Sequence, residues 1–291
     1  MRIKLLLAIS ASAMASALPA AQAPAYDAPI VVEGELQRDA AVRNYVNALA
    51  IASPGEKIAR FEKSICPASV GLSDEMNRQV EQRIRRVAAA ASVPVAAPGC
   101  AANLLLFVAP DRAAFIRKIQ KERPMLFGLM TDSQVRGLAE QTGGAVTWQL
   151  FEQRGADGRT LNNAGARDEG PSTLAGVTSS RLLPQTRTDL DITVVVLEPA
   201  AFTGATITQL ADYVAMSGLM QTAPQGHPKA AAPTILTLLE DKRLGRPAPM
   251  SVTAYDLAYL KALYTMSNTL QAAPQRSELV SRMKANLAAS N

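Results

Sequence analysis

Few residues in this chain could do nucleophilic or metal chemistry. Its 291 residues include one histidine, His227, and two cysteines, Cys66 and Cys100. A zinc hydrolase site of the His-Glu-x-x-His type needs two imidazoles one helical turn apart, and a single histidine cannot supply them. A serine triad would need His227 as its base, and the sequence has no Gly-x-Ser-x-Gly elbow to carry the nucleophile. His227, which lies between Gly226 and Pro228, is therefore predicted to be a loop histidine.

Carboxylates are the remaining groups that could act as an acid and a base. Asp189 and Asp191 alternate onto one side of the start of an expected strand, and Asp256 lies in the first turn of an expected helix. Two carboxyl groups roughly 5–10 Å apart can hydrolyse a bond without a metal. Aspartates at the starts of strands and helices are also typical of turns and helix caps. We expect the capping role and keep hydrolysis as the alternative.

The sequence lacks motifs for binding phosphate groups or nucleic acids. It has no Gly-x-Gly-x-x-Gly and no Gly-Lys-Ser/Thr loop, and a β-turn explains the glycines at 154–159. Apolar residues expected to face the core interrupt the basic runs at 83–86 and 117–121. These runs therefore predict solvated helix faces rather than a nucleic-acid groove. We predict no cofactor and no nucleic-acid partner.

Residues 1–25 have the three-part layout of a secretory signal peptide. A short positive segment precedes the apolar residues 5–17, a stretch too short for the ~20 residues that span a bilayer. Cleavage after Ala23 or Ala25 fits the Ala-x-Ala pattern, and Ala25 is preferred because Pro24 would otherwise follow the cut. We expect a periplasmic or secreted protein without an integral membrane segment after cleavage.

Export to an oxidising compartment predicts a disulfide between Cys66 and Cys100. One pair of thiols has only one connectivity, and each cysteine lies beside turn residues. A redox-active pair would need a close Cys-x-x-Cys spacing, and a papain-like Cys–His pair would need a free thiol. We predict a structural bridge, whose loop of about 35 residues stabilises the fold by roughly 3–4 kcal/mol.

Hydrophobic periodicity predicts strands interleaved with helices. Residues 103–109 are a continuous apolar run suited to a strand buried on both faces, whereas 73–91 has the pattern of an amphipathic helix. Segments 131–134 and 206–209 have the Thr-x-x-Gln form of a capping box. Further strands are expected at 58–62, 145–154 and 192–197. Further helices are expected at 36–52, 111–122, from 131 onward, 206–220, 252–264 and 277–289.

This alternation favours a single α/β (α+β) domain over residues 26–291, in which helices pack on a mixed β-sheet in layers. Hydrophobic residues make up 48% of the chain and charged residues 19%, which is typical of a globular protein. Aromatic residues make up only 4%, so the core must be mainly aliphatic. A polar, glycine-containing stretch near 155–178 is predicted to be a flexible surface loop.

The C-terminal half resembles a known class of enzymes over about residues 190–265. A buried strand is followed by a helix that ends in Gly218-Leu219, and then by the short Pro233-Thr234-Ile235-Leu236. Next comes Ser251-Val252-Thr253-Ala254-Tyr255-Asp256-Leu257, which leads into Leu260-Lys261-Ala262-Leu263-Tyr264. This order resembles metzincin-type zinc peptidases. The whole chain also resembles a family of secreted bacterial proteins with a similar leader and cysteine pair, for which no activity is implied.

The resemblance implies a zincin-like fold without its metal site. With Gly218-Leu219 as the anchor, the two metal-binding histidines of the peptidases fall on Ala211 and Ala215, and their glutamate falls on Asp212. Methyl side chains cannot hold zinc, so the resemblance implies no bound metal and no metal-activated water. The candidate site residues on this helix and the next are Gln209, Asp212, Tyr213 and Asp256.

Together these observations predict an exported, non-catalytic protein that acts by binding a protein or small-molecule ligand on a degenerate peptidase scaffold. The alternative is a metal-independent hydrolase that uses carboxylates such as Asp212 and Asp256. The two hypotheses differ in whether these carboxylates face a substrate.

Overall fold

The computed structural model describes residues 35–51, 57–161, 185–222, 232–268 and 272–290. The predicted signal peptide, His227 and the part of the 155–178 loop from residue 162 onward lie outside these ranges.

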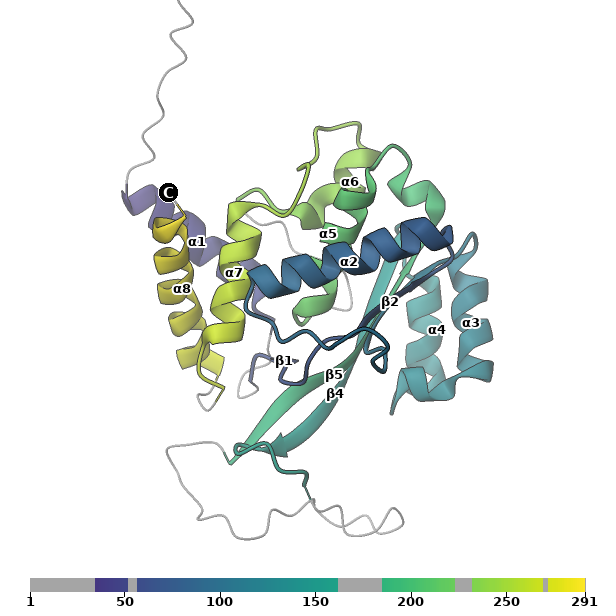
Figure 1. Cartoon of the computed structure of the whole chain (residues 1–291), viewed down its shortest axis with the longest axis horizontal. Helices are drawn as coiled ribbons and strands as arrows, with labels where there is room; N and C mark the ends of the chain where they lie inside the picture. The colour runs from purple at the N-terminus through teal and green to yellow at the C-terminus, as the bar shows by residue number, and fades with distance from the viewer. Residues whose placement is uncertain (1–34, 52–56, 162–184, 223–231, 269–271, 291) are drawn as a thin grey trace, which may run out of the picture. The chain divides into compact units, whose positions relative to one another are not determined.

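A mixed sheet forms the centre of the described part (Figure 1). Its strands are β1 (Arg60–Phe61), β2 (Pro67–Val70), β3 (Leu104–Val108), β4 (Ala145–Gly155) and β5 (Thr186–Leu197). β2, β3 and β5 lie parallel in that order. β1 runs parallel to β5 beside Asp189 and Leu190, whereas β4 is antiparallel to β5. The predicted α/β class, with a mixed sheet in one layered domain, is confirmed.

Helices cover both faces of this sheet (Figure 1). α2 (Asp74–Ala90) and α5 (Ile207–Leu219) pack against each other on one face, and α3 (Arg112–Glu122) and α4 (Asp132–Glu140) cover the other. α1, α7 and α8 contact one another and extend the core under α2 and α5. Their bounds are Glu35–Leu49, Ala254–Thr265 and Ala272–Ala289.

Shorter elements complete the fold. They are α6 (Leu238–Arg243) and the 3₁₀ turns η1 (Pro124–Phe127), η2 (Pro199–Phe202) and η3 (Ile235–Thr237). Within the described ranges, no helix is both long enough and apolar enough to cross a bilayer.

β3 shows why the apolar run at 103–109 is continuous. Leu104 and Leu106 belong to the core under α2 and α5, whereas Leu105 and Phe107 face the core under α3 and α4. β5 divides its valines between the two cores in the same way. Because helices cover both faces of these strands, neither strand needs the polar half of an alternating pattern.

The helix starts follow the predicted caps. The Asp111 side chain accepts a hydrogen bond from the Ala114 amide at 2.8 Å and begins α3. Both predicted capping boxes are present at the starts of α4 and α5. A third capping box, between Thr253 and Asp256, begins α7 and was not predicted.

Several predicted boundaries are wrong. The strand expected at 58–62 is only the two-residue β1, and β2 is a strand that periodicity did not predict. β5 begins at Thr186, so Asp189 and Asp191 lie inside the strand rather than at its start. Asp191 is the extra residue of a β-bulge, because Leu150 of β4 pairs with Ile192 and the next residue pairs with Leu190. α8 begins five residues earlier than expected, at Ala272.

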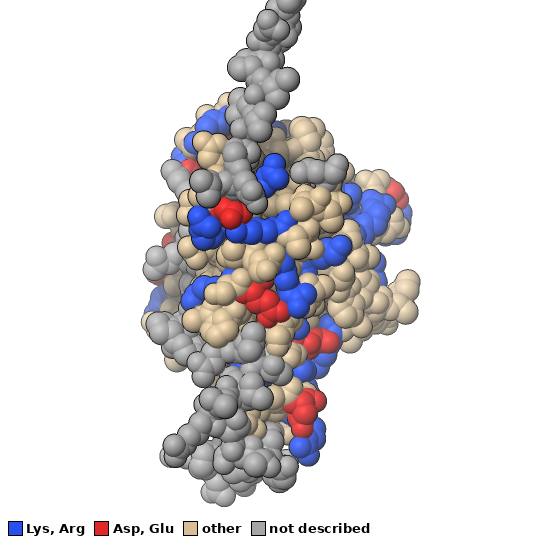
Figure 2. All heavy atoms as spheres, turned by 90° about the vertical axis from the view of Figure 1, so that its left-hand side faces the viewer, with Lys and Arg blue, Asp and Glu red and all other residues tan. Residues whose placement is uncertain are grey.

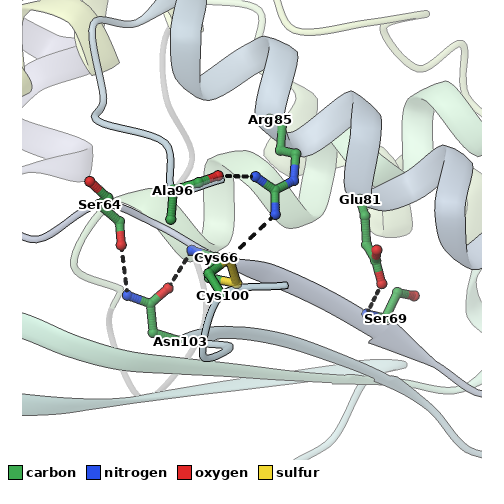
Figure 3. Close-up of a disulfide and its surroundings, with 8 residues drawn as sticks. All are labelled: Ser64, Cys66, Ser69, Glu81, Arg85, Ala96, Cys100 and Asn103. Carbon is green, nitrogen blue, oxygen red and sulfur yellow. Dashed lines mark hydrogen bonds between the residues drawn. A yellow bond between two sulfur atoms is a disulfide. The ribbon is translucent and has the colours of Figure 1, made fainter. Parts of the chain in front are cut away.

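Cys66 and Cys100 form the predicted disulfide, which joins the residue before β2 to the loop before β3 (Figure 3). Asn103 supports it: its side-chain oxygen accepts from the Cys66 amide at 2.7 Å and its side-chain nitrogen donates to the Ser64 carbonyl at 3.2 Å. Arg85 of α2 donates to Cys100 Sγ at 3.5 Å and to the Ala96 carbonyl. The bridge is therefore part of a hydrogen-bonded junction between α2 and the sheet.

Candidate functional site

Asp212, the candidate on α5, is completely buried and lies opposite Arg83 of α2. Arg83 donates to both carboxylate oxygens, from Nε at 2.6 Å and from Nη2 at 2.9 Å. The Ser251 hydroxyl and the Val252 amide also donate to Oδ2, each at 2.8 Å. The hydrogen bond to Asp212 raises the pKa of Arg83 above its ordinary value. The carboxylate is thus the centre of a buried ion pair and joins three segments of the fold.

Asp256, the candidate on α7, is also completely buried. Its Oδ1 accepts from the Tyr45 and Thr234 hydroxyls, and its Oδ2 accepts from the backbone amides of Ile235 (2.9 Å) and Thr253 (2.8 Å). Burial raises the pKa of the Tyr45 hydroxyl well above its usual range, and the charge of Asp256 adds to that rise. The carboxylate oxygens of Asp256 therefore cap the start of α7 and bind Tyr45 and residues 234–235 to it.

The two carboxylates hold the chain between α5 and α7 at two points. Asp256 holds residues 234–235 at the start of η3, and Asp212 holds residues 251–252, just before α7. A general acid or base must reach the substrate directly or through one water. Both side chains are enclosed and their oxygens accept hydrogen bonds from framework groups, and Asp256 has the capping role that was expected for it.

Gln209 and Tyr213, the other candidates on α5, have structural roles too. Gln209 closes the capping box with Thr206 and donates to the Pro249 carbonyl at 2.8 Å. Burial raises the pKa of Tyr213 to about 12, partly offset by its hydrogen bond with Ser217. From Gln209 to Leu219 every residue of α5 is buried, including Ala211 and Ala215. The positions that the peptidase resemblance assigns to metal ligands therefore lie in the hydrophobic core.

Asp189 and Asp191 contact different cations. Asp189 is buried and pairs with Arg187 at 2.9 Å, and burial raises the pKa of Asp189 more than this guanidinium lowers it. Asp191 is more exposed and pairs with Lys63 at 3.0 Å. Lys63 also pairs with Glu152, at 3.2 Å. Each of these two acids of β5 therefore balances a different cation, and among the described residues the two do not share a partner.

Ionic side chains of both signs also mix on the face formed by α1 and α8. Figure 2 shows this side, where Lys and Arg alternate with Asp, Glu and uncharged residues. Lys284 of α8 pairs with Asp39 of α1, and Arg282 pairs with Glu278 within α8. On this face the structure shows no continuous basic surface among the described residues that the figure draws.

A groove of about 570 Å³ lies between α3 and α4, next to η1. Its apolar lining includes Phe127, Val135 and Ala139, which are at least nine-tenths buried. A concave site with an apolar floor and a few polar groups is the usual form of a small-molecule site. Its volume and its partly apolar lining make this groove, which described residues line, the candidate small-molecule site.

Three exposed cations line this groove: Arg117 and Lys121 of α3, and Arg136 of α4. Within the part of the chain that the structure describes, none of the three forms an ion pair. Two acids also line it, Asp132 and Glu140, and Asp132 accepts a hydrogen bond from Gln120 at 2.9 Å. The groove therefore offers unpaired positive charge beside an apolar surface.

Sequence reasoning did not identify this groove. The run 117–121 was correctly predicted to be a solvated helix face, but its cations become part of a site only because α4 packs beside α3. The available signal was the apolar stretch 124–130 between two helices that both carry exposed arginines.

No protein-family model, no curated protein and no solved structure matches the chain.

Proposed function

We propose that this chain is an exported, non-catalytic binding protein whose ligand occupies the groove between α3 and α4. The groove's apolar floor beside Arg117, Lys121 and Arg136 carries the proposal. Such a site favours an organic anion with an apolar body, because the floor buries the body while a cation contacts the charge. The zincin-like scaffold without metal ligands remains part of the proposal and is supported only by the order of segments over 190–265.

Two observations support an extracytoplasmic location. The first 25 residues have the layout of a cleavable leader, and Cys66 and Cys100 are joined in a disulfide. Structural disulfides persist in oxidising compartments and are rare in the cytosol of mesophiles. Mass spectrometry of the protein secreted or released from the periplasm tests this, because the mature N-terminus should follow Ala25 or Ala23.

The carboxylate hydrolase is the rival function. Asp212 and Asp256 would have to exchange their present hydrogen bonds for a substrate and a water, and each would then leave a buried donor unpaired. A screen of the purified protein against peptide, ester and glycan substrates tests the rival. Turnover that is lost in a folded Asp212→Asn variant would establish the rival and overturn the proposal of a non-catalytic protein.

The binding proposal is tested by titrating the protein with dodecanoate, below its micelle concentration, in a calorimeter. We expect saturable binding of one dodecanoate per chain. The double variant Arg117→Glu/Arg136→Glu should bind at least about tenfold more weakly, because charge-assisted contacts contribute about 1.5–3 kcal/mol each.

The matched control is Arg43→Glu/Arg86→Glu, which makes the same charge change at exposed arginines on α1 and α2. It should bind dodecanoate like the unaltered protein. Absence of saturable binding contradicts the proposal, and so does an equal loss of affinity in the two double variants, because that result would reflect net charge and not the groove.

A further inference from the structure

The turn between α3 and α4 exposes two large apolar side chains. Residues 124–130 have the sequence Pro-Met-Leu-Phe-Gly-Leu-Met and contain η1. Met125 is 74% exposed, and Leu129 is as exposed as it would be in an extended peptide, at 102%. Water thus surrounds two residues whose side chains favour an apolar environment.

Contacts with β4 hold the rest of the turn in place. The Phe127 ring stacks on the Trp148 ring with 5.1 Å between their centroids, and Trp148 Nε1 donates to the Leu126 carbonyl at 2.7 Å. Leu150 lies against Gly128, where an added Cβ would be 3.0 Å from the leucine side chain. Because the inward side chains are anchored, Met125 and Leu129 are presented to solvent by a fixed backbone.

Cations lie on the helices that lead into and out of this apolar tip. Arg123 immediately precedes the turn, Arg117 and Lys121 lie on the last turns of α3, and Arg136 lies on α4. All four are exposed, and none has an ion-pair partner among the residues that the structure describes. Lys118 is the exception nearby, since it lies 3.9 Å from Glu122. The end of the α3–α4 hairpin therefore combines an apolar tip with unpaired positive charge.

We infer that this tip, Met125 and Leu129 with Arg123 and the neighbouring cations, docks on an anionic lipid surface. The two apolar side chains enter the boundary between headgroups and acyl chains, while the cations remain among the headgroup phosphates. Apolar burial and attraction to anionic lipids add in this mode of peripheral binding, and each basic residue near the surface contributes about 1 kcal/mol. This inference goes beyond the proposed groove ligand and does not depend on it.

A lipid surface fits this tip better than a protein partner does. Stable protein interfaces bury about 800 Å² on each partner around an apolar centre. Here the strongly exposed apolar part of the tip is confined to Met125 and Leu129, two side chains of one turn, which is much less than such an interface buries. A diffuse anionic surface can satisfy all of the neighbouring cations at once without a matching shape.

Flotation of the full mature chain with lipid vesicles tests the inference. We expect the protein to float with vesicles of equal parts phosphatidylglycerol and phosphatidylcholine, and not with pure phosphatidylcholine. Raising the salt from about 0.05 to 0.5 M should weaken the binding, because the screening length falls several-fold. Met125→Ser/Leu129→Ser should lower the partition coefficient about tenfold or more, since two apolar side chains no longer leave water. Arg123→Glu should lower it as well.

The control variant is Met76→Ser/Leu244→Ser, which changes two partly exposed apolar residues, one on α2 and one just after α6, and should float like the unaltered protein. Equal binding by the tip variant and the unaltered protein would overturn the inference. No binding to the anionic vesicles would overturn it too, and this is the result expected if the tip contacts a protein instead.

The outcome is separable from that of the groove experiment. Arg123, Met125 and Leu129 do not line the groove, so their variants should still bind dodecanoate normally. A protein that floats with anionic vesicles but does not bind dodecanoate would support the docking inference and contradict the proposed ligand site.

Discussion

Arg83 of α2 and Asp212 of α5 form a two-point ion pair that joins the helices packed on one face of the sheet. The carboxylate is fully buried, whereas the guanidinium side chain is 24% exposed. The carboxylate of the pair is therefore shielded from solvent, whereas the guanidinium is partly solvated. Because the acid is the enclosed partner, loss of Arg83 would leave a buried negative charge without its cation.

Replacing Arg83 by Met should destabilise the protein by about 3–5 kcal/mol, because a buried carboxylate would lose its charged partner. Urea unfolding followed by circular dichroism measures the change. Arg86→Met, at an exposed position of the same helix, should change the unfolding free energy by less than about 0.5 kcal/mol. If the two variants are equally stable, the ion pair is not a structural element.

Tyr45→Phe should lower the unfolding free energy by about 1–3 kcal/mol, because the buried Asp256 carboxylate would lose a donor. Tyr259→Phe is the control. That ring is as deeply buried, but its hydroxyl has no hydrogen-bond partner among the described residues. Thermal unfolding of the two variants should therefore differ. Similar losses would show that Asp256 does not depend on Tyr45.

Removing the disulfide with Cys66→Ser/Cys100→Ser should cost roughly 3–4 kcal/mol of stability on the chain-entropy model. Titration of the unfolded, unreduced protein should detect no free thiol, in agreement with the structure, and titration after reduction should detect both. Two reactive thiols before reduction would show that the bridge does not form in solution.

Stability should fall in alkaline solution because burial raises the pKa of several tyrosines. The pKa of Tyr213 is raised from its ordinary 10.0 to about 12, and those of Tyr45, Tyr259 and Tyr264 are raised as well. Below pH 10 the hydroxyls are neutral in both states and this stability is fully present. As the pH rises towards 12, the unfolded chain loses its protons first and the native state loses its advantage.

Tyr213 alone accounts for roughly 2–3 kcal/mol of this loss, since each pKa unit corresponds to about 1.4 kcal/mol. Urea unfolding between pH 9 and pH 12 measures the slope. Tyr213→Phe should make the slope shallower without changing its sign. An unchanged slope would mean that Tyr213 ionises equally easily in the folded and unfolded states.

The parts of the fold that the sequence predicts are those set by short stretches of neighbouring residues. The apolar run of β3, the periodicity of α2 and the Thr-x-x-Gln capping boxes each act over a few residues, and the structure contains all three features. β2 could not be predicted in this way. It is only four residues long, begins with a proline next to Cys66, and becomes a strand because β3 pairs with it.

The candidate site depended on contacts that no local pattern contains. Asp212 and Arg83 are 129 residues apart, and Asp256 and Tyr45 are 211 residues apart. The sequence identified both acids as notable, but only their partners show that they belong to the framework. The groove escaped prediction for the same reason, because its lining joins residues of α3, η1 and α4 that are unremarkable one helix at a time.

The position of Trp148 has a practical consequence. It is the sole tryptophan of the chain, and it packs against η1, in the turn that both lines the groove and carries the exposed tip. Ultraviolet emission excited selectively from indole therefore comes from this one place. A change in the surroundings of this turn can therefore be timed in the unlabelled molecule, with no dye and no engineered chromophore.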